Sequence, residues 1–72
     1  MSSDTVYRVT EIVGSSDDSV SEAINRALGR AHRTLRNLNW FEVVQIRGSL
    51  DSEAHPTYQV TLKVGFHLEE PE

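Results

Sequence analysis

The fold is decided by the stretch Tyr58-Gln59-Val60-Thr61-Leu62-Lys63-Val64-Gly65-Phe66-His67-Leu68, in which large apolar residues alternate with polar residues and one glycine. Side chains along a strand point to opposite sides in turn, so the apolar residues share one face and the others share the second face. No other part of the chain alternates so regularly. We therefore predict a strand over 58–68 and expect it at the centre of a sheet.

Two more strands are predicted on either side of a helix. Residues 6–13 alternate, with Tyr7, Val9 and Val13 on one side, and the alternation ends at 14–16. Residues 40–47 are rich in β-branched and aromatic side chains, which favour strands. Residues 48–57 contain Pro56 and are expected to connect this strand to the next, and residues 69–72 form a polar tail.

Residues 20–38 have the apolar spacing of an amphipathic helix of about five turns. The apolar stripe consists of Val20, Ala23, Ile24, Ala27, Leu28, Ala31, Leu35 and Leu38. Its alanines would let the helix lie close to a sheet. Ser19 with Glu22 matches a capping box, and Ser16 is an alternative N-cap.

These elements predict an α+β fold, a single β-α-β-β domain over residues 1–72 with one helix on one face of the sheet. The last two strands are joined by a loop of about ten residues and should pair antiparallel. A right-handed crossover through the helix would make the first and second strands run the same way. Both conditions are met by a fully antiparallel sheet of order 1-3-2.

Composition narrows the class of protein. A chain of 72 residues without cysteine has a small core and no disulfides, so oligomerisation is the expected source of additional stability. The net charge of −4 disfavours nucleic acid as a partner. No stretch matches a signal peptide or a membrane span, which predicts a cytoplasmic protein without membrane contact.

Trp40 and Phe41 are neighbours in a predicted strand, so they must point to opposite faces and at most one can lie under the helix. The other would be exposed in a monomer, which indicates an interface or a ligand platform. The alternative is that Trp40 plugs the end of the core. The pattern alone does not choose between them.

Four segments together resemble the dodecin family and cover nearly the whole chain. They are Tyr7-Arg8-Val9-Thr10-Glu11-Ile12-Val13-Gly14, Thr34-Leu35-Arg36-Asn37-Leu38-Asn39-Trp40-Phe41-Glu42-Val43, Ile46-Arg47-Gly48 and Tyr58-Gln59-Val60-Thr61-Leu62-Lys63-Val64-Gly65-Phe66. Two positions depart from the family pattern: Asn39 stands where many members carry Asp, and His67 stands where many bacterial members carry Arg.

The resemblance implies a hollow homododecamer that binds flavins in stacked pairs between protomers, as a store that quenches flavin photochemistry and not as an enzyme. It implies that Trp40 stacks on the isoalloxazine ring and that Gln59 hydrogen-bonds the polar edge of that ring. Arg47 is a candidate phosphate contact, and His67 can add positive charge only when protonated. The choice between riboflavin and FMN stays open.

Spacing along the predicted hairpin places these residues apart. A turn centred near residue 52 or 53 sets Trp40 opposite Gly65 and Gln59 near Ile46, about 20 Å further along the strands. One chain therefore cannot easily place both on one ring. We expect a binding site built from several protomers.

Three further groups of residues have simple structural explanations. One helix face carries three arginines, Arg26, Arg30 and Arg33. This face is a solvated surface, an ion-pair seam or a phosphate site. The resemblance makes coenzyme A a second candidate ligand there, because some bacterial dodecins are thought to bind it.

The three histidines have no metal-ligand spacing, so no bound metal is expected. Asp17 and Asp18 are read as helix-dipole groups. A ligand-free structural oligomer and a small nucleotide-binding module are the alternative functions.

Overall fold

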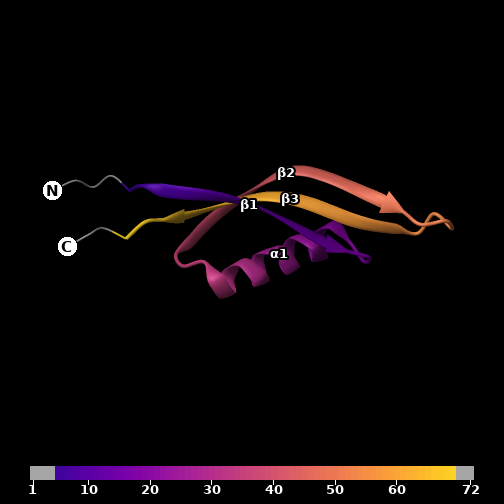
Figure 1. Ribbon diagram of the computed structural model, residues 1–72, viewed down its shortest axis with the longest axis horizontal. Helices are drawn as coiled ribbons and strands as arrows, with labels where there is room; N and C mark the ends of the chain where they lie inside the picture. Colours follow the sequence, from indigo (N-terminus) through magenta and orange to yellow (C-terminus); the bar gives the residue numbers. More distant parts are fainter. Residues whose placement is uncertain (1–4, 70–72) are drawn as a thin grey trace.

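The computed structural model describes residues 5–69. Its elements are β1 (Tyr7–Ser16), α1 (Val20–Thr34), β2 (Leu38–Leu50) and β3 (Pro56–His67). The three strands form one sheet of order β1-β3-β2, and both neighbouring pairs are antiparallel. The helix lies on one side of this sheet (Figure 1). The predicted topology and the central place of the last strand are confirmed.

The core lies between α1 and the two strands beneath it. Val60, Leu62 and Val64 of β3 are fully buried, and Val60 and Leu62 form one cluster with the buried helix residues Ala23 and Ala27. A methyl group added at Gly14 of β1 would collide with the backbone oxygen of Ala23 and press on Ala27. The small residues on both elements therefore let the helix backbone approach the sheet, as the alanine stripe predicted.

The helix N-terminus is held by two serines in succession. Ser19 is the N-cap, and its Oγ accepts a hydrogen bond from the backbone N–H of Glu22 at 3.0 Å. The Oγ of Ser16 accepts from the backbone N–H of Asp18 at 2.9 Å and of Ser19 at 3.4 Å. The predicted cap is confirmed, and Ser16 orders the loop before it instead of capping the helix.

The helix is shorter than its apolar pattern predicts, because it ends at Thr34 and not at Leu38. Asn37 has φ 65°, a left-handed conformation that a helix cannot contain, and Leu38 is already the first residue of β2. The backbone N–H of His67 donates to the carbonyl of Asn37 at 3.3 Å. Pairing with the end of β3 therefore overrides the helical periodicity.

The strands are longer than predicted. β1 continues through Gly14 to Ser16, β2 extends to Leu50, and β3 begins at Pro56 instead of residue 58. Pro56 is tolerated because it stands at the first position of its strand. The connection therefore spans only residues 51–55, and Ala54 takes a left-handed φ of 64° there. Asp51 organises this turn, since its Oδ1 accepts from the backbone N–H groups of Glu53 and His55.

Two irregularities interrupt the pairing of β2 with β3, one at Asn39 and one at Val44. Trp40 lies opposite Gly65, as predicted, but Gln59 lies opposite Arg47 and not Ile46. The extra residue at Val44 accounts for this offset of one position. Because alternate residues face opposite sides, each bulge also changes which side chains of β2 share a face.

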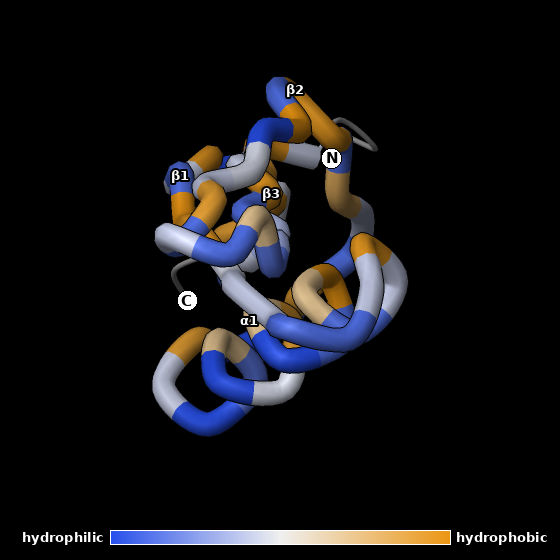
Figure 2. The backbone as a smooth tube through the Cα atoms, turned by 90° about the vertical axis from the view of Figure 1, so that its right-hand side faces the viewer, coloured by the Kyte–Doolittle hydropathy of each residue, from blue (hydrophilic) through white to orange (hydrophobic). Residues whose placement is uncertain are grey.

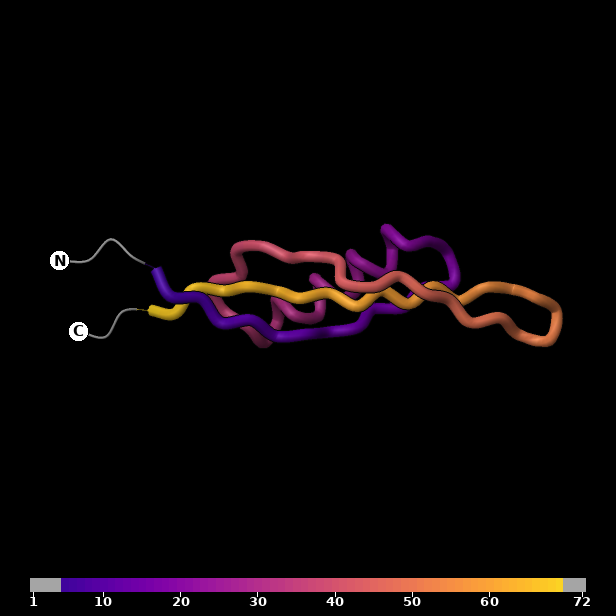
Figure 3. Tube along the Cα trace, turned by 90° about the horizontal axis from the view of Figure 1, so that it is seen from above, coloured from indigo at the N-terminus to yellow at the C-terminus, as the bar shows by residue number. Residues whose placement is uncertain are grey.

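The protomer is elongated, with extents of 59 × 20 × 14 Å and a radius of gyration of 15.4 Å. A compact domain of this size would have a radius near 11 Å. Viewed along the long axis, β2 is the strand furthest from α1 (Figure 2), and the β2–β3 hairpin extends beyond the rest of the sheet (Figure 3). The helix packs on β1 and β3, and every residue from Asn39 to Leu50 is exposed.

At most one of the two neighbouring aromatics was predicted to lie under the helix, and α1 covers neither of them. Trp40 is 41% exposed and Phe41 is 47% exposed, although they do point to opposite faces as predicted. A helix of 15 residues covers only two strands, so β2 is bare on the helix side as well.

Candidate functional site

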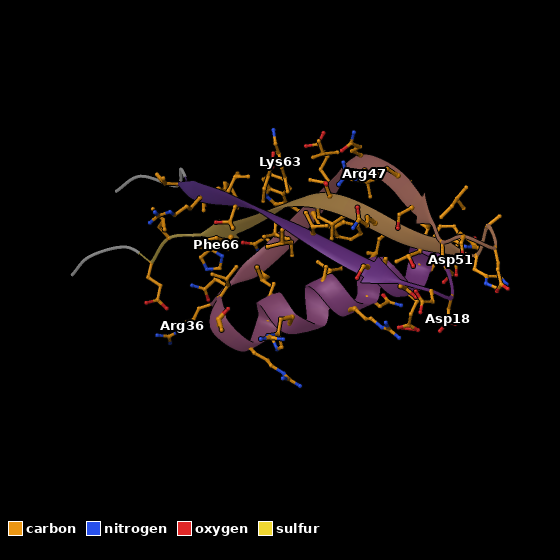
Figure 4. The ribbon with its side chains drawn as sticks, turned by 45° about the vertical axis from the view of Figure 1, so that its right-hand side comes forward. Asp18, Arg36, Arg47, Asp51, Lys63 and Phe66 are labelled. Atoms are coloured by element: carbon orange, nitrogen blue, oxygen red, sulfur yellow. The ribbon has the colours of Figure 1, made fainter. Side chains whose placement is uncertain are left out.

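The predicted site residues lie on the sheet face opposite α1, which we call the open face. The open face of β3 carries Gln59, Thr61, Lys63, Gly65 and His67, since Val60, Leu62 and Val64 between them are buried on the helix side. Figure 4 shows Arg47 and Lys63 projecting from this side of the sheet and Phe66 from the helix side. Trp40 is paired with Gly65 and so belongs to the open face. The alternative that Trp40 plugs the core under the helix is excluded.

The indole of Trp40 lies flat against the backbone of Gly65. A methyl group built on Gly65 would overlap three indole atoms, Cε2, Cζ2 and Nε1. Only glycine lets the ring lie this close to the strand. The arrangement leaves Gly65 buried, while Trp40 is 41% exposed. An aromatic surface supported from behind and open in front suits the stacking of a second flat ring.

His67 lies at the same end of the open face, where Asn39 contacts both its backbone and its imidazole ring. The Oδ1 of Asn39 accepts a hydrogen bond from the backbone N–H of His67 at 3.1 Å and lies 2.7 Å from Nδ1 of the imidazole. An amide oxygen can only accept, so Nδ1 must carry the proton in the neutral ring. The other nitrogen, Nε2, is then the acceptor of the ring.

Arg47 and Gln59 form a pair near the other end of the open face. They are cross-strand partners in β2 and β3, and the Nε of Arg47 donates a hydrogen bond to Oε1 of Gln59 at 2.8 Å. The sequence predicted both residues for the site but did not predict this bond.

The structure thus joins the four predicted residues in two groups and keeps the groups apart. Trp40 and His67 lie near one end of the open face, and Arg47 and Gln59 lie near the other end. Gly65, the cross-strand partner of Trp40, is six residues from Gln59 along β3. Six strand residues span about 20 Å, as predicted. Lys63 lies between the groups with Glu11 and Glu42 opposite it on the neighbouring strands. One protomer therefore cannot place all four residues on one small ligand.

The bulge at Val44 puts Arg47 on the open face. The sequence analysis did not predict this bulge. Without this extra residue, Arg47 would point to the helix side and could not meet Gln59. The sequence does contain a signal for the bulge, because the adjacent apolar residues Val43 and Val44 break the alternation between Phe41 and Arg47. Asn39 was also missed as the partner of His67, although it was noted as a departure from the family pattern.

Other candidate sites are less developed. Arg26, Gly29, Arg30 and Arg33 line an exposed hollow of about 310 Å³ on the helix, where Arg26 also approaches Glu22 at 3.8 Å. Within residues 5–69, no three His, Cys, Asp or Glu side chains are grouped as a metal would require. No helix in the same range has the length and apolar character needed to cross a membrane.

Fold and site define a class: a small βαββ protomer with an uncovered outer strand and an aromatic platform on its open face. Comparison with known proteins identifies the family. The family model described as Dodecin matches residues 6–69. A dodecin of Thermus thermophilus is 51% identical over 65 residues, covering 90% of this chain and 94% of the relative. The chain belongs to the dodecin family.

Solved structures agree with this assignment. The dodecin from Streptomyces davaonensis superposes with a TM-score of 0.88 at 51% identity, covering 94% of this chain and all of that chain. A more distant relative is the calcium dodecin of Mycobacterium tuberculosis, 30% identical over 64 residues, or 89% of this chain and 90% of the relative. Its crystal structure, with a TM-score of 0.81, is described as having a novel calcium-binding site.

Proposed function

We propose that this protein stores and buffers flavin, binding riboflavin or FMN in stacked pairs between subunits of a hollow homododecamer in the cytoplasm. One observation carries the proposal: the indole of Trp40 is supported by Gly65 on the open face, and Trp40 is 41% exposed. Isoalloxazine is flat and electron-poor, and indole is electron-rich, so offset stacking contributes about 0.5 to 1.5 kcal/mol beyond the burial of area.

The bare strand β2 supports the assembly part of the proposal. Its helix side presents an apolar row, Phe41, Val43 and Ile46, each at least 39% exposed in the protomer. An apolar groove of about 440 Å³ lies between β1 and α1, lined in part by Ile12, Ala27 and Leu35. Soluble proteins rarely leave such surfaces uncovered. Further copies of the chain would cover them and supply the second group of site residues to each flavin.

Stacking of the flavin on Trp40 would also suppress the photochemistry of the bound flavin. A photoexcited flavin takes one electron from the indole of Trp40 and returns it, so both rings recover their ground states without net reaction. The excited state then decays before it can sensitise oxygen. Gln59 would hold the polar edge of the ring, and Arg47 and His67 are the candidate contacts for the phosphate when the ligand is FMN. No residue is assigned a catalytic role, so the protein binds flavin without turnover.

The proposal is tested by titrating purified protein into riboflavin and FMN while following flavin fluorescence. Binding should quench nearly all emission, and Trp40→Leu should abolish quenching while keeping the oligomer, measured by light scattering. Phe41→Leu is the matched control on the opposite face of the same strand and should retain quenching. Wild-type protein that leaves flavin fluorescence unchanged would refute flavin storage and favour a ligand-free structural oligomer.

A second candidate function rests on the arginine hollow of α1. Guanidinium groups around Gly29 could hold the phosphates of a nucleotide such as coenzyme A. Calorimetric titration with coenzyme A tests this site independently of flavin. Arg30→Glu should abolish coenzyme A binding and leave flavin quenching intact, whereas equal heats for wild type and variant would remove this candidate.

A further inference from the structure

We propose that Arg47 is a positioning residue for Gln59, and that the two side chains together recognise the imide edge of the ligand, the O=C–NH–C=O group. This inference rests on the proposed function and refines it. It also assigns Arg47 a role on the ring, in addition to any contact with a phosphate.

The contact between the two side chains fixes which way the Gln59 amide points. Arginine has N–H donors and no acceptor, so the atom that meets Nε of Arg47 at 2.8 Å must be the amide oxygen Oε1. The Nε2 group of Gln59 then points away from the guanidinium. A free glutamine amide could present either orientation, whereas this pair presents one.

The oriented pair offers three hydrogen-bonding groups in a fixed order. A terminal N–H of Arg47 donates, the second lone pair of Gln59 Oε1 accepts, and Gln59 Nε2 donates. Among residues 5–69, the recorded ion pairs do not involve Arg47, so its terminal nitrogens are available to a ligand. The order donor, acceptor, donor complements an edge with the order acceptor, donor, acceptor.

The pyrimidinedione ring of a flavin has such an edge in C2=O, N3–H and C4=O. Gln59 alone satisfies two of these groups, and the Arg47 guanidinium supplies the donor for the third carbonyl. The bulge at Val44 is what brings Arg47 to the open face for this purpose. Ligands with an imide should therefore bind better than flat rings of equal size without one.

A double-mutant cycle tests whether Arg47 acts through Gln59. Riboflavin is the probe because it has no phosphate, and binding is followed by fluorescence quenching in wild type, Arg47→Met, Gln59→Met and the double variant. Arg47→Met should weaken riboflavin about ten-fold when Gln59 is present, the order expected for losing a charge-assisted hydrogen bond, and less than about two-fold in the Gln59→Met background. Losses that are equal in both backgrounds would overturn the proposal. So would a loss seen with FMN but not with riboflavin.

A modified ligand tests the imide directly. Riboflavin methylated at N3 has no N–H to donate to Gln59 and should bind wild type at least about ten-fold more weakly than riboflavin. The Gln59→Met variant is the control and should bind both flavins about equally. Equal affinity of wild type for the two flavins would contradict imide recognition.

A measurement without ligand separates this inference from the proposed function. In protein labelled with ¹⁵N-arginine, the Nε–H of Arg47 should exchange slowly with water, and Gln59→Met should remove that protection. Fast exchange in the wild type would show that the pair is not formed and would overturn the proposal. Wild-type protein that binds no flavin would refute flavin storage, while this signal still decides whether Arg47 holds Gln59.

Discussion

The two halves of the sheet differ in what holds them. β1 and β3 lie under α1 and bury Val60, Leu62 and Val64 completely, whereas β2 is exposed from Asn39 to its end. Within residues 5–69, β2 is held chiefly by its backbone pairing with β3. The first half is stabilised by its own chain. The second half carries Trp40, Arg47 and the apolar row, through which we expect the protein to meet its ligand and other copies.

The largest predicted effect is a loss of stability from a change at the centre of the half of the sheet that α1 covers. We call this half, β1 and β3, the covered half. Leu62→Ala removes a fully buried side chain and should lower the free energy of unfolding by about 2 to 5 kcal/mol. Leu50→Ala makes the same chemical change on β2, where Leu50 is 68% exposed, and should cost less than about 1 kcal/mol. Urea denaturation followed by circular dichroism at one protomer concentration measures both. Equal losses would contradict the contrast between the halves.

The next effect concerns assembly and should come from β2. Ile46 lies on the helix side of β2, 55% exposed, in the apolar row that we expect another copy to cover. Ile46→Glu would bury a charge at that contact and should weaken it about 100-fold or more, which disperses the particle at micromolar concentration. Sedimentation velocity measures the result. Gln45→Glu adds the same charge one residue away on the open face and should leave the particle intact; the same loss in both variants would mean that the apolar row is not the contact.

Much of the covered half could be predicted from sequence, because its signals are local. The alternation over 58–68, the alanine spacing of the helix and the Ser19 cap each depend on residues close together in the chain, and each is confirmed. The helix end at Thr34 was missed because a long-range contact decides it, between Asn37 and the end of β3.

The site was predicted less completely for the same reason. Trp40 opposite Gly65 follows from counting along a hairpin, and this register is confirmed. The contacts of Arg47 with Gln59 and of Asn39 with His67 depend on bulges, which a regular count of residues does not include. Assignment of these residues to a flavin remains a prediction from the family.

The platform itself can be disturbed without touching the core. Gly65→Ala places a methyl group where the indole of Trp40 lies, so the ring must swing away, and riboflavin affinity should fall about ten-fold. Gly29→Ala is the control, since nothing lies within 4 Å of the added methyl group and alanine favours the helix. Fluorescence quenching measures affinity. Unchanged affinity in Gly65→Ala would show that close packing of the Trp40 indole against Gly65 is not needed for binding.

The smallest effect should appear at the tip of the hairpin, which is the part of β2 and β3 furthest from the core. Backbone N–H groups of His55 and Glu53 donate to Asp51 and hold its pKa below the ordinary value of 3.8. A carboxyl with a lowered pKa stabilises the folded turn above that ordinary value, and the contribution is lost as the pH falls through the folded pKa. Acidification below pH 3.8 should therefore speed amide hydrogen exchange at residues 53 and 55 before the helix responds. Asp51→Ala should produce the same local change at neutral pH, and Asp51→Asn, which keeps an acceptor oxygen, should produce less of it. If amide hydrogen exchange in β1 and α1 became faster together with that at the tip, the two halves of the sheet would unfold as one unit.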